Sequence, residues 1–164
     1  MTIGITGHQR LSDDSRWAWV KNEILNFFRD KKPLTGFSSL AIGADQLFAD
    51  CVLQSGGALV AVIPFEGYER TFQTEQDLSR FNDLKAQAAE VRVLSDQKDD
   101  QESFLVAGKV VVESTEVLLA VWDGLPAKGK GGTGDAVTYA LSRGHKVVHV
   151  NPQNQTVREL TTKS

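Results

Sequence analysis

A chain of 164 residues is long enough to bury a full core as one domain, without disulfides or structural metals. Hydrophobic residues at 41% and charged residues at 24% are ordinary values for a globular domain, which excludes a disordered chain. The net charge of -3, with no block of Lys or Arg, disfavours a long nucleic acid as partner, although a bound mononucleotide needs only a few local donors.

The first predicted strand covers residues 2–6, and a turn at residues 7–10 leads into a helix that Ser12 or Asp13 caps and that runs to about Lys31. The remaining expected elements are strands at 38–42, 58–63, 90–94, 116–122 and 146–150, and helices at 45–56, 75–89, 103–114 and 136–141. Helix and strand compete at the three valines 110–112, and we favour a helix because strands flank this segment on both sides. Residues 1–152 are expected to form a single domain, and residues 153–164 a loose polar tail.

Strand and helix alternate about six times along the chain, and this pattern is typical of one fold class. It predicts an α/β fold with a doubly wound, mostly parallel sheet of about six strands and helices on both faces. In such a sheet, ligands bind beyond the carboxyl ends of the strands, at the point where the strand order reverses. Any site is therefore expected in the turns that follow the strands.

Three turns that follow predicted strands carry polar or glycine residues, and we expect them to meet at this edge of the sheet. They are Gly7-His8-Gln9-Arg10, Gly43-Ala44-Asp45 and Lys130-Gly131-Gly132-Thr133-Gly134. The last turn follows an apolar strand and precedes a helix, so its uncovered amides and the helix dipole suit a phosphate. It is neither a P-loop nor a G-x-G-x-x-G dinucleotide fingerprint, and a turn that binds nothing is the alternative.

Each candidate side chain in the first two turns has a functional and an ordinary interpretation. Arg10 is a candidate for holding a phosphate through its guanidinium fork, and the His8 ring is a candidate donor. Both are otherwise solvent-facing turn residues. The Asp45 carboxylate is able to accept hydrogen bonds from ribose hydroxyls, or to cap the helix that begins there.

The candidates around the later turns also keep two interpretations. Asp123, next to Gly124, either binds sugar hydroxyls or caps its own turn, and Lys130 either faces a phosphate or is solvated. Trp122 is expected in the core or in a pocket wall. An aromatic segment comprises Phe65, Tyr68 and Phe72. It either lines a nucleobase pocket or packs beneath a loop, and we favour packing beneath a loop.

Several other chemistries are not indicated. Cys51 lies in a helical pattern and is expected to be a small buried hydrophobe rather than a catalytic thiol, because no nearby histidine activates it. We expect no metal site, because the three histidines do not form a ligand cluster with Cys51, and no cofactor. No Gly-x-Ser-x-Gly elbow indicates a serine hydrolase. We expect a cytoplasmic protein without membrane contact, because no signal-like or membrane-spanning run occurs.

An ordered set of motifs over roughly residues 2–152 resembles the SLOG superfamily, which includes Smf-type DNA-processing proteins and Lonely Guy proteins. The motifs are Thr6-Gly7-His8-Gln9-Arg10, Ala41-Ile42-Gly43-Ala44-Asp45, Ile63-Pro64-Phe65 with Tyr68 and Phe72, and Ala120-Val121-Trp122-Asp123-Gly124 with Gly131-Gly132-Thr133-Gly134. The resemblance implies a Rossmann-like nucleotide-binding fold whose turns face a nucleotide or a nucleotide-derived signalling ligand. It also implies a possible homo-oligomer, since such assemblies are frequent among relatives.

The resemblance leaves three functions open. A nucleotide-binding domain is the leading hypothesis. The second is a nucleotide N-glycosidase of the Lonely Guy kind, but the position of that family's catalytic glutamate falls at Thr138, whose hydroxyl cannot replace a carboxylate. Asp135 and Asp45 are the candidate catalytic carboxylates for this alternative. The third is a scaffold or subunit that has kept the fold and lost the ligand.

Overall fold

Seven strands form a single sheet in the order β4-β3-β2-β1-β5-β6-β7 in the computed structural model, which describes residues 1–95, 97–125 and 132–162. The strands are β1 Thr2–Gly7, β2 Thr35–Ser38, β3 Ala58–Ile63, β4 Glu90–Val93, β5 Val117–Val121, β6 Lys146–Asn151 and β7 Thr156–Leu160. All neighbours pair in parallel except β7, which runs antiparallel to β6. The predicted α/β class with a mostly parallel sheet is confirmed.

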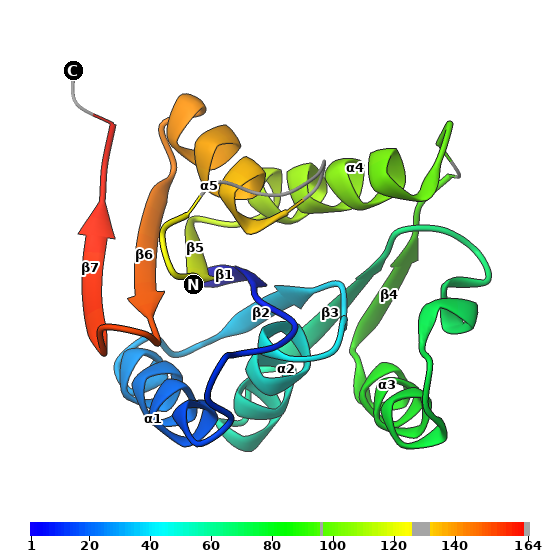
Figure 1. Cartoon of the computed structure of the whole chain (residues 1–164), viewed down its shortest axis with the longest axis horizontal. Helices are drawn as coiled ribbons and strands as arrows, with labels where there is room; N and C mark the ends of the chain where they lie inside the picture. Colours follow the sequence, from blue (N-terminus) through cyan, green and yellow to red (C-terminus); the bar gives the residue numbers. More distant parts are fainter. Residues whose placement is uncertain (96, 126–131, 163–164) are drawn as a thin grey trace.

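Helices cover both faces of the sheet (Figure 1). They are α1 Arg16–Phe28, α2 Ala44–Gln54, α3 Glu75–Gln87, α4 Asp100–Glu113 and α5 Thr133–Ser142, with a short 3-10 helix, η1, at Tyr68–Thr71. Helices α1, α2 and α3 lie on one face, and α4 and α5 lie on the other. The sheet is therefore doubly wound, and each face buries its own hydrophobic core.

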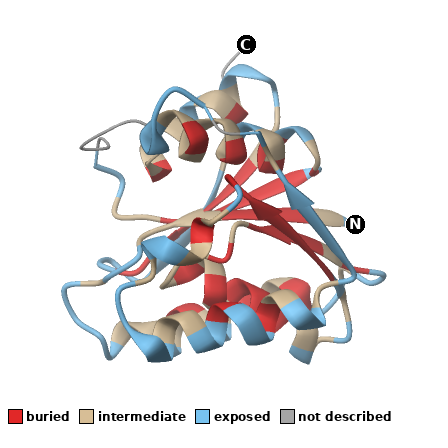
Figure 2. Ribbon diagram, turned by 90° about the vertical axis from the view of Figure 1, so that its right-hand side faces the viewer, coloured by how far each residue is buried: buried red, intermediate tan, exposed pale blue. Residues whose placement is uncertain are grey.

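Apolar periodicity explains how the elements fill these two cores. The α1 helix buries Val20, Ile24 and Phe28, which recur every four residues and so form a single stripe against the sheet. Each such side chain contributes about 1.5–3 kcal/mol when fully buried. The central strands are buried on both sides, as their continuous apolar runs require, and Figure 2 shows burial concentrated in the sheet and on the helix faces turned toward it.

The reversal of strand order lies between β1 and β5. From β1 the chain builds outward through β2, β3 and β4, then returns through α4 to place β5 on the other side of β1. The carboxyl ends of β1 and β5 therefore lie side by side, with Gly7 opposite Val121 in the register. The loops that leave these two strands in opposite directions open a crevice between them.

Two predictions differ from the structure by more than a shift of an element's ends. The second strand ends at Ser38 rather than residue 42, because Leu40 has a left-handed backbone (φ 59°) and donates its N–H to the Ser38 hydroxyl, which ends the ladder. The residues after Pro152 are not a loose tail, because Thr156–Leu160 pair with β6 as an edge strand. The third strand, at 58–63, and the helix over the three valines 110–112 are confirmed.

Candidate functional site

A cavity of about 1130 Å³ lies at the carboxyl edge of the sheet, where β1 and β5 end. This volume is slightly above the usual range of about 300–1,000 Å³ for small-molecule pockets in proteins. Ten of the predicted site residues line it: Gly7, His8, Arg10, Asp45, Tyr68, Trp122, Asp123, Gly132, Thr133 and Gly134. The structure thus brings together residues that the sequence separates by more than a hundred positions.

The turns after β1 and β2 interlock behind the cavity, which explains three of the expected residues. The N–H of Ala44 donates to the carbonyl of His8 at 3.0 Å, and a Cβ on Gly7 would lie 2.5 Å from the Ala44 Cβ. Gly43 has φ 83°, and a Cβ there would lie 2.4 Å from the carbonyl oxygen of Gln9. Gly43 and Ala44 are not part of the cavity lining, so their observed role is to hold the two turns together.

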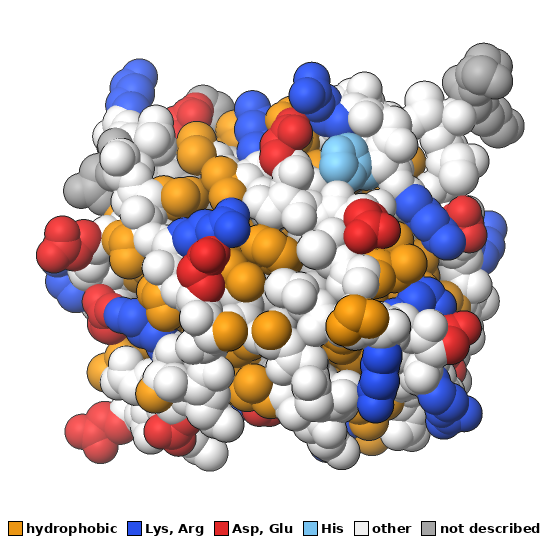
Figure 3. All heavy atoms as spheres, turned by 180° about the vertical axis from the view of Figure 1, so that it is seen from behind, with side chains coloured by type: hydrophobic (Ala, Val, Ile, Leu, Met, Phe, Trp, Pro, Cys, Tyr) orange, Lys and Arg blue, Asp and Glu red, His pale blue; other side chains and the backbone are white. Residues whose placement is uncertain are grey.

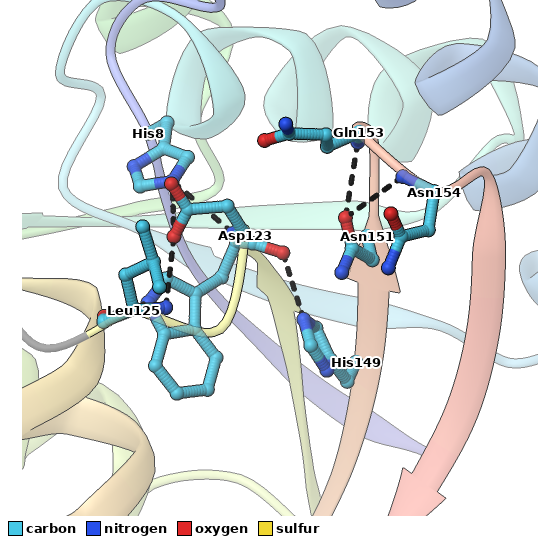
Figure 4. Close-up of polar contacts among 8 residues, drawn as sticks. His8, Asp123, Leu125, His149, Asn151, Gln153 and Asn154 are labelled. Atoms are coloured by element: carbon cyan, nitrogen blue, oxygen red, sulfur yellow. Dashed lines mark hydrogen bonds and ion pairs between the residues drawn. The ribbon is translucent and has the colours of Figure 1, made fainter.

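His8 and Asp123 face each other across the ends of β1 and β5 (Figure 4). The backbone N–H of Asp123 donates to His8 Nε2 at 3.2 Å, and the Asp123 carboxylate lies 3.5 Å from the same nitrogen. Because Nε2 accepts a hydrogen bond, the neutral ring carries its proton on Nδ1. The carboxylate also accepts the N–H of Leu125 at 2.9 Å, so Asp123 caps its own turn, as one of its two interpretations required.

Trp122 lies in the cavity wall, consistent with its sequence interpretation. Its indole N–H donates to the Leu125 carbonyl at 2.8 Å, and its ring lies 5.2 Å from that of His149. The His149 Nε2 donates to the Trp122 carbonyl at 2.7 Å, which fixes the start of the loop after β5 (Figure 4). Gly124, at φ 87°, forms an exposed turn beside this pair and does not line the cavity.

The first turn of α5 opens onto the cavity. The helix begins at Thr133, three residues before the predicted start, and Gly132 is its N-cap residue. Glycine has no side chain with which to cap the first-turn amides, and the helix dipole adds positive potential there. This geometry attracts an anion. The predicted contributions of Lys130 and Gly131 lie outside the described residues.

Polar side chains from three other segments complete the mouth of the cavity. Arg10 is exposed there and has no ion-pair partner among the residues that the structure describes. Arg16 is held by Asp13 at 3.5 Å and by the Pro152 carbonyl at 3.4 Å. Gln153 lies in the turn between β6 and β7, and its side chain extends toward the side where His8 lies (Figure 4).

The sequence interpretation missed Gln153 and Arg16. Asn151 organises the turn that carries Gln153, because its side-chain oxygen accepts the N–H groups of Gln153 and Asn154 at 3.0 and 3.2 Å. An Asn-Pro turn signal followed by Thr156 and Val157 was the available indication of a hairpin. For Arg16 we find no comparable signal, since its contact with Pro152 depends on tertiary structure.

Asp45, the second residue of α2, places its carboxyl group in the cavity wall. One oxygen, Oδ2, accepts the N–H of Ala41 at 3.4 Å. Burial raises the pKa of this carboxyl to about 7, and the Ala41 hydrogen bond offsets only part of that rise. Asp45 is therefore a carboxyl group that changes its charge near neutral pH.

The aromatic segment packs together, as we favoured, and two of its members also lie at the cavity. Tyr68 is 4% exposed and packs edge-on against Phe65, Phe72 and Phe81, with ring centroids 5.8, 5.4 and 5.6 Å away. Tyr68 and Phe72 also line the cavity. Burial, and to a lesser extent the charge of Asp45, raises the pKa of the Tyr68 phenol.

The other candidate carboxylate, Asp135, does not line the main cavity. It borders a separate, much smaller pocket beside Lys109 and Tyr139, and Thr138 is exposed. Burial raises the pKa of the Cys51 thiol to about 11, so this buried cysteine is unreactive at neutral pH. Among the described residues, no group of three or more His, Cys, Asp or Glu side chains is arranged to hold a metal ion.

Figure 3 shows one face of the molecule, on which side chains of both charges are interspersed. Within the described part of the chain, no helix has the length and apolar character needed to cross a membrane.

The fold and the cavity define a class: a Rossmann-like, doubly wound α/β protein with a pocket at its topological switch point. The fold is similar to that of DNA processing protein A (DprA) from Streptococcus pneumoniae, with a TM-score of 0.64 and 19% identity over 90% of this chain. The chain spans about half of that protein, covering 49% of its length.

Two further structures have the same fold. DprA from Helicobacter pylori, which binds single-stranded DNA, has a TM-score of 0.65 and 15% identity over 94% of this chain and 70% of its own. A molybdenum cofactor binding protein from the phototrophic bacterium Rippkaea orientalis has a TM-score of 0.56 and 15% identity, covering 99% and 88%. No protein-family model and no curated protein sequence matches the chain. The chain therefore has the Rossmann-like fold that the motif set implied.

Proposed function

We propose that this chain binds a nucleotide or a nucleotide-derived small molecule in the switch-point cavity. The observation that carries the proposal is the single cavity that Arg10 shares with the first turn of α5. An anionic group of the ligand binds the Gly132, Thr133 and Gly134 segment and the Arg10 guanidinium, and the rest of the ligand extends toward Asp45. The ligands of the similar structures, single-stranded DNA and a molybdenum cofactor, support an anionic ligand that carries a heterocycle.

A substitution at the N-cap of α5 separates binding from folding. Gly132 has φ -74° and ψ 173°, which any residue adopts, so Gly132→Asp supplies a good capping side chain without backbone strain. The new carboxylate occupies the position proposed for the ligand's anion and repels it. We expect unchanged or raised thermal stability together with loss of nucleotide binding.

The binding measurement is isothermal titration calorimetry with AMP, GMP, NAD, ADP-ribose and cyclic ADP-ribose, and with inorganic phosphate and a single-stranded oligonucleotide. Arg10→Gln is expected to weaken nucleotide binding about tenfold or more, because it removes charge-assisted hydrogen bonds. Arg29→Gln, at the far end of α1, is the matched control and leaves affinity unchanged. The proposal is refuted if none of these nucleotides binds at millimolar concentration.

Hydrolysis of a nucleotide N-glycosidic bond is the second candidate, and one observation favours it. The Asp45 pKa of about 7 suits a general acid or base at neutral pH. Incubation with nucleoside monophosphates, followed by chromatography for the free base, decides between binding and hydrolysis. Release that disappears in Asp45→Asn supports the enzyme. A native mass spectrum tests the predicted homo-oligomer and detects a co-purified ligand.

A further inference from the structure

The end of the cavity opposite α5 has its own chemistry. The strand order places the loops along the edge in the sequence β3, β2, β1, β5, so the segments that follow β3 and β2 lie farthest from α5. Two carboxylates, Asp77 and Asp45, and the aromatic rings of Tyr68 and Phe72 line this end. A phosphate is repelled there, so this end has to bind a different part of the ligand.

The Asp45 carboxyl is left with unused acceptor capacity. Within the described ranges 1–95, 97–125 and 132–162, its hydrogen-bond donor is the N–H of Ala41, at the long distance of 3.4 Å, and it has no cationic partner. A carboxylate offers about four lone-pair positions on its two oxygens. Most of them therefore stay open to a donor in the cavity.

The loop that positions Asp45 is braced by buried polar side chains. The Gln46 side chain is 1% exposed and donates to the Leu40 carbonyl at 3.2 Å. The fully buried Ser38 hydroxyl donates to the Asp45 carbonyl at 3.0 Å and accepts the Leu40 N–H at 3.1 Å. Leu40 itself has a left-handed backbone, which is costly for a branched side chain. Strain of this kind persists where the surrounding structure imposes a particular geometry.

We propose that Asp45 binds the paired N–H groups of a 2-amino-4-oxopyrimidine ring, the edge that guanine nucleotides and pterins share. The inference rests on the proposed function, because it places the base of the same ligand. A carboxylate accepts and never donates, and the ring N–H and amino N–H of this edge point the same way, which matches its two oxygens. The Tyr68 and Phe72 rings form the apolar wall beside the heterocycle.

The same geometry rejects adenine. The corresponding edge of adenine has a bare ring nitrogen next to its amino group, so one lone pair would face the carboxylate. A site built around a hydrogen bond discriminates strongly against an analogue that lacks it. Hypoxanthine has the ring N–H without the 2-amino group and is expected to bind with intermediate affinity.

The test is calorimetric titration of GMP, IMP, AMP and 6-hydroxymethylpterin at pH 8, where the Asp45 carboxyl is ionised. We expect GMP to bind about ten- to a hundredfold more tightly than AMP, with IMP between them. Asp45→Asn keeps the shape of the side chain but presents one acceptor and one donor. It is expected to lower GMP affinity about tenfold or more and to leave AMP affinity unchanged or improved.

The control is Asp83→Asn, which changes an exposed carboxylate on α3 outside the cavity lining and is expected to leave the GMP preference intact. Thermal melting confirms that both variants are folded. If the pterin binds more tightly than GMP, the ligand that presents this edge is a pterin. If GMP binds more tightly, the ligand is a guanine nucleotide. Equal affinities for GMP and AMP, both lowered by Arg10→Gln, overturn this inference alone. Failure of every probe, including the pterin that has no phosphate, overturns both it and the proposed function.

Discussion

The raised pKa of Asp45 makes the stability of the ligand-free protein depend on pH in a direction opposite to that of most carboxylates. An unfolded chain releases the Asp45 proton near the ordinary pKa of 3.8, whereas the folded chain holds it until about pH 7. Between these values the folded state binds one proton more than the unfolded state. The free energy of unfolding therefore falls as pH rises through this window, and it levels off above pH 7.

The size of the effect follows from the width of the window. About three pH units at 1.36 kcal/mol each set an upper limit of about 4 kcal/mol, of which roughly two thirds falls above pH 5. Because the carboxyl group borders an open cavity, solvent screening reduces this limit. We expect Asp45→Asn to gain ~1–2 kcal/mol over the native chain between pH 5 and pH 8, because the amide does not ionise.

Urea unfolding of both proteins at pH 5, 6, 7 and 8 measures this difference, and Asp83→Asn, an exposed carboxylate on α3, serves as control. The native chain and Asp83→Asn are expected to follow the same pH profile. A stability difference between Asp45→Asn and the native chain that stays constant from pH 5 to pH 8 would show that the carboxyl is solvated. The argument for a desolvated acceptor at this end of the cavity would then be wrong.

Three further substitutions test the packing around the site by denaturant unfolding. Gly43→Ala is expected to lower the free energy of unfolding by about 2–4 kcal/mol, because it combines a positive φ with a Cβ that clashes with the turn after β1. Gly56→Ala also has a positive φ but open space around the Cβ, and it should lower the free energy of unfolding by ~1 kcal/mol. Equal losses in the two variants would contradict the interlocked turns. Gln46→Leu leaves the buried Leu40 carbonyl without its side-chain donor, so it should lower the free energy of unfolding by about 1–3 kcal/mol and also weaken GMP binding. Unchanged GMP affinity would argue against the bracing role of Gln46. Phe48→Ala empties a fully buried position and should cost about 3–5 kcal/mol, and a loss below ~1 kcal/mol would mean that this core is loosely packed.

Continuous apolar runs made most of the fold predictable. The third strand was predicted with its observed bounds, because residues 58–63 form a short continuous apolar run bounded by glycines and a proline, and five of its residues are buried in the structure. The second strand was placed too far along the chain because Ser39, Leu40 and Ala41 look like its continuation. What ends it is the backbone of Leu40, a conformation set by the Gln46 and Ser38 hydrogen bonds rather than by residue type. The β7 strand is mostly exposed, so hydrophobic pattern gave no signal for it.

The sequence could predict those site residues that directly follow the ends of strands. Sequence placed His8 and Asp123 at one edge of the sheet, but their direct contact requires that β5 lie next to β1, which follows from topology alone. Asp135 illustrates the opposite error. It adjoins the glycine-rich turn in sequence, yet the helix that begins at Thr133 turns it into another pocket, because residues of one helical turn point in different directions.

The distribution of charge along the cavity restricts the class of ligand more than the volume of the cavity does. The first turn of α5, which follows β5, and Arg10, which follows β1, favour an anion. The nearby Asp123 is already engaged with His8 and the N–H of Leu125. The β2 side presents the acceptor of Asp45 instead. Inorganic phosphate matches the anion-binding side alone, whereas the Asp45 carboxylate on the β2 side repels a uniform polyanion. A single molecule with a phosphate at one end and an N–H donor edge at the other satisfies both sides, and on this ground we propose a mononucleotide-like ligand.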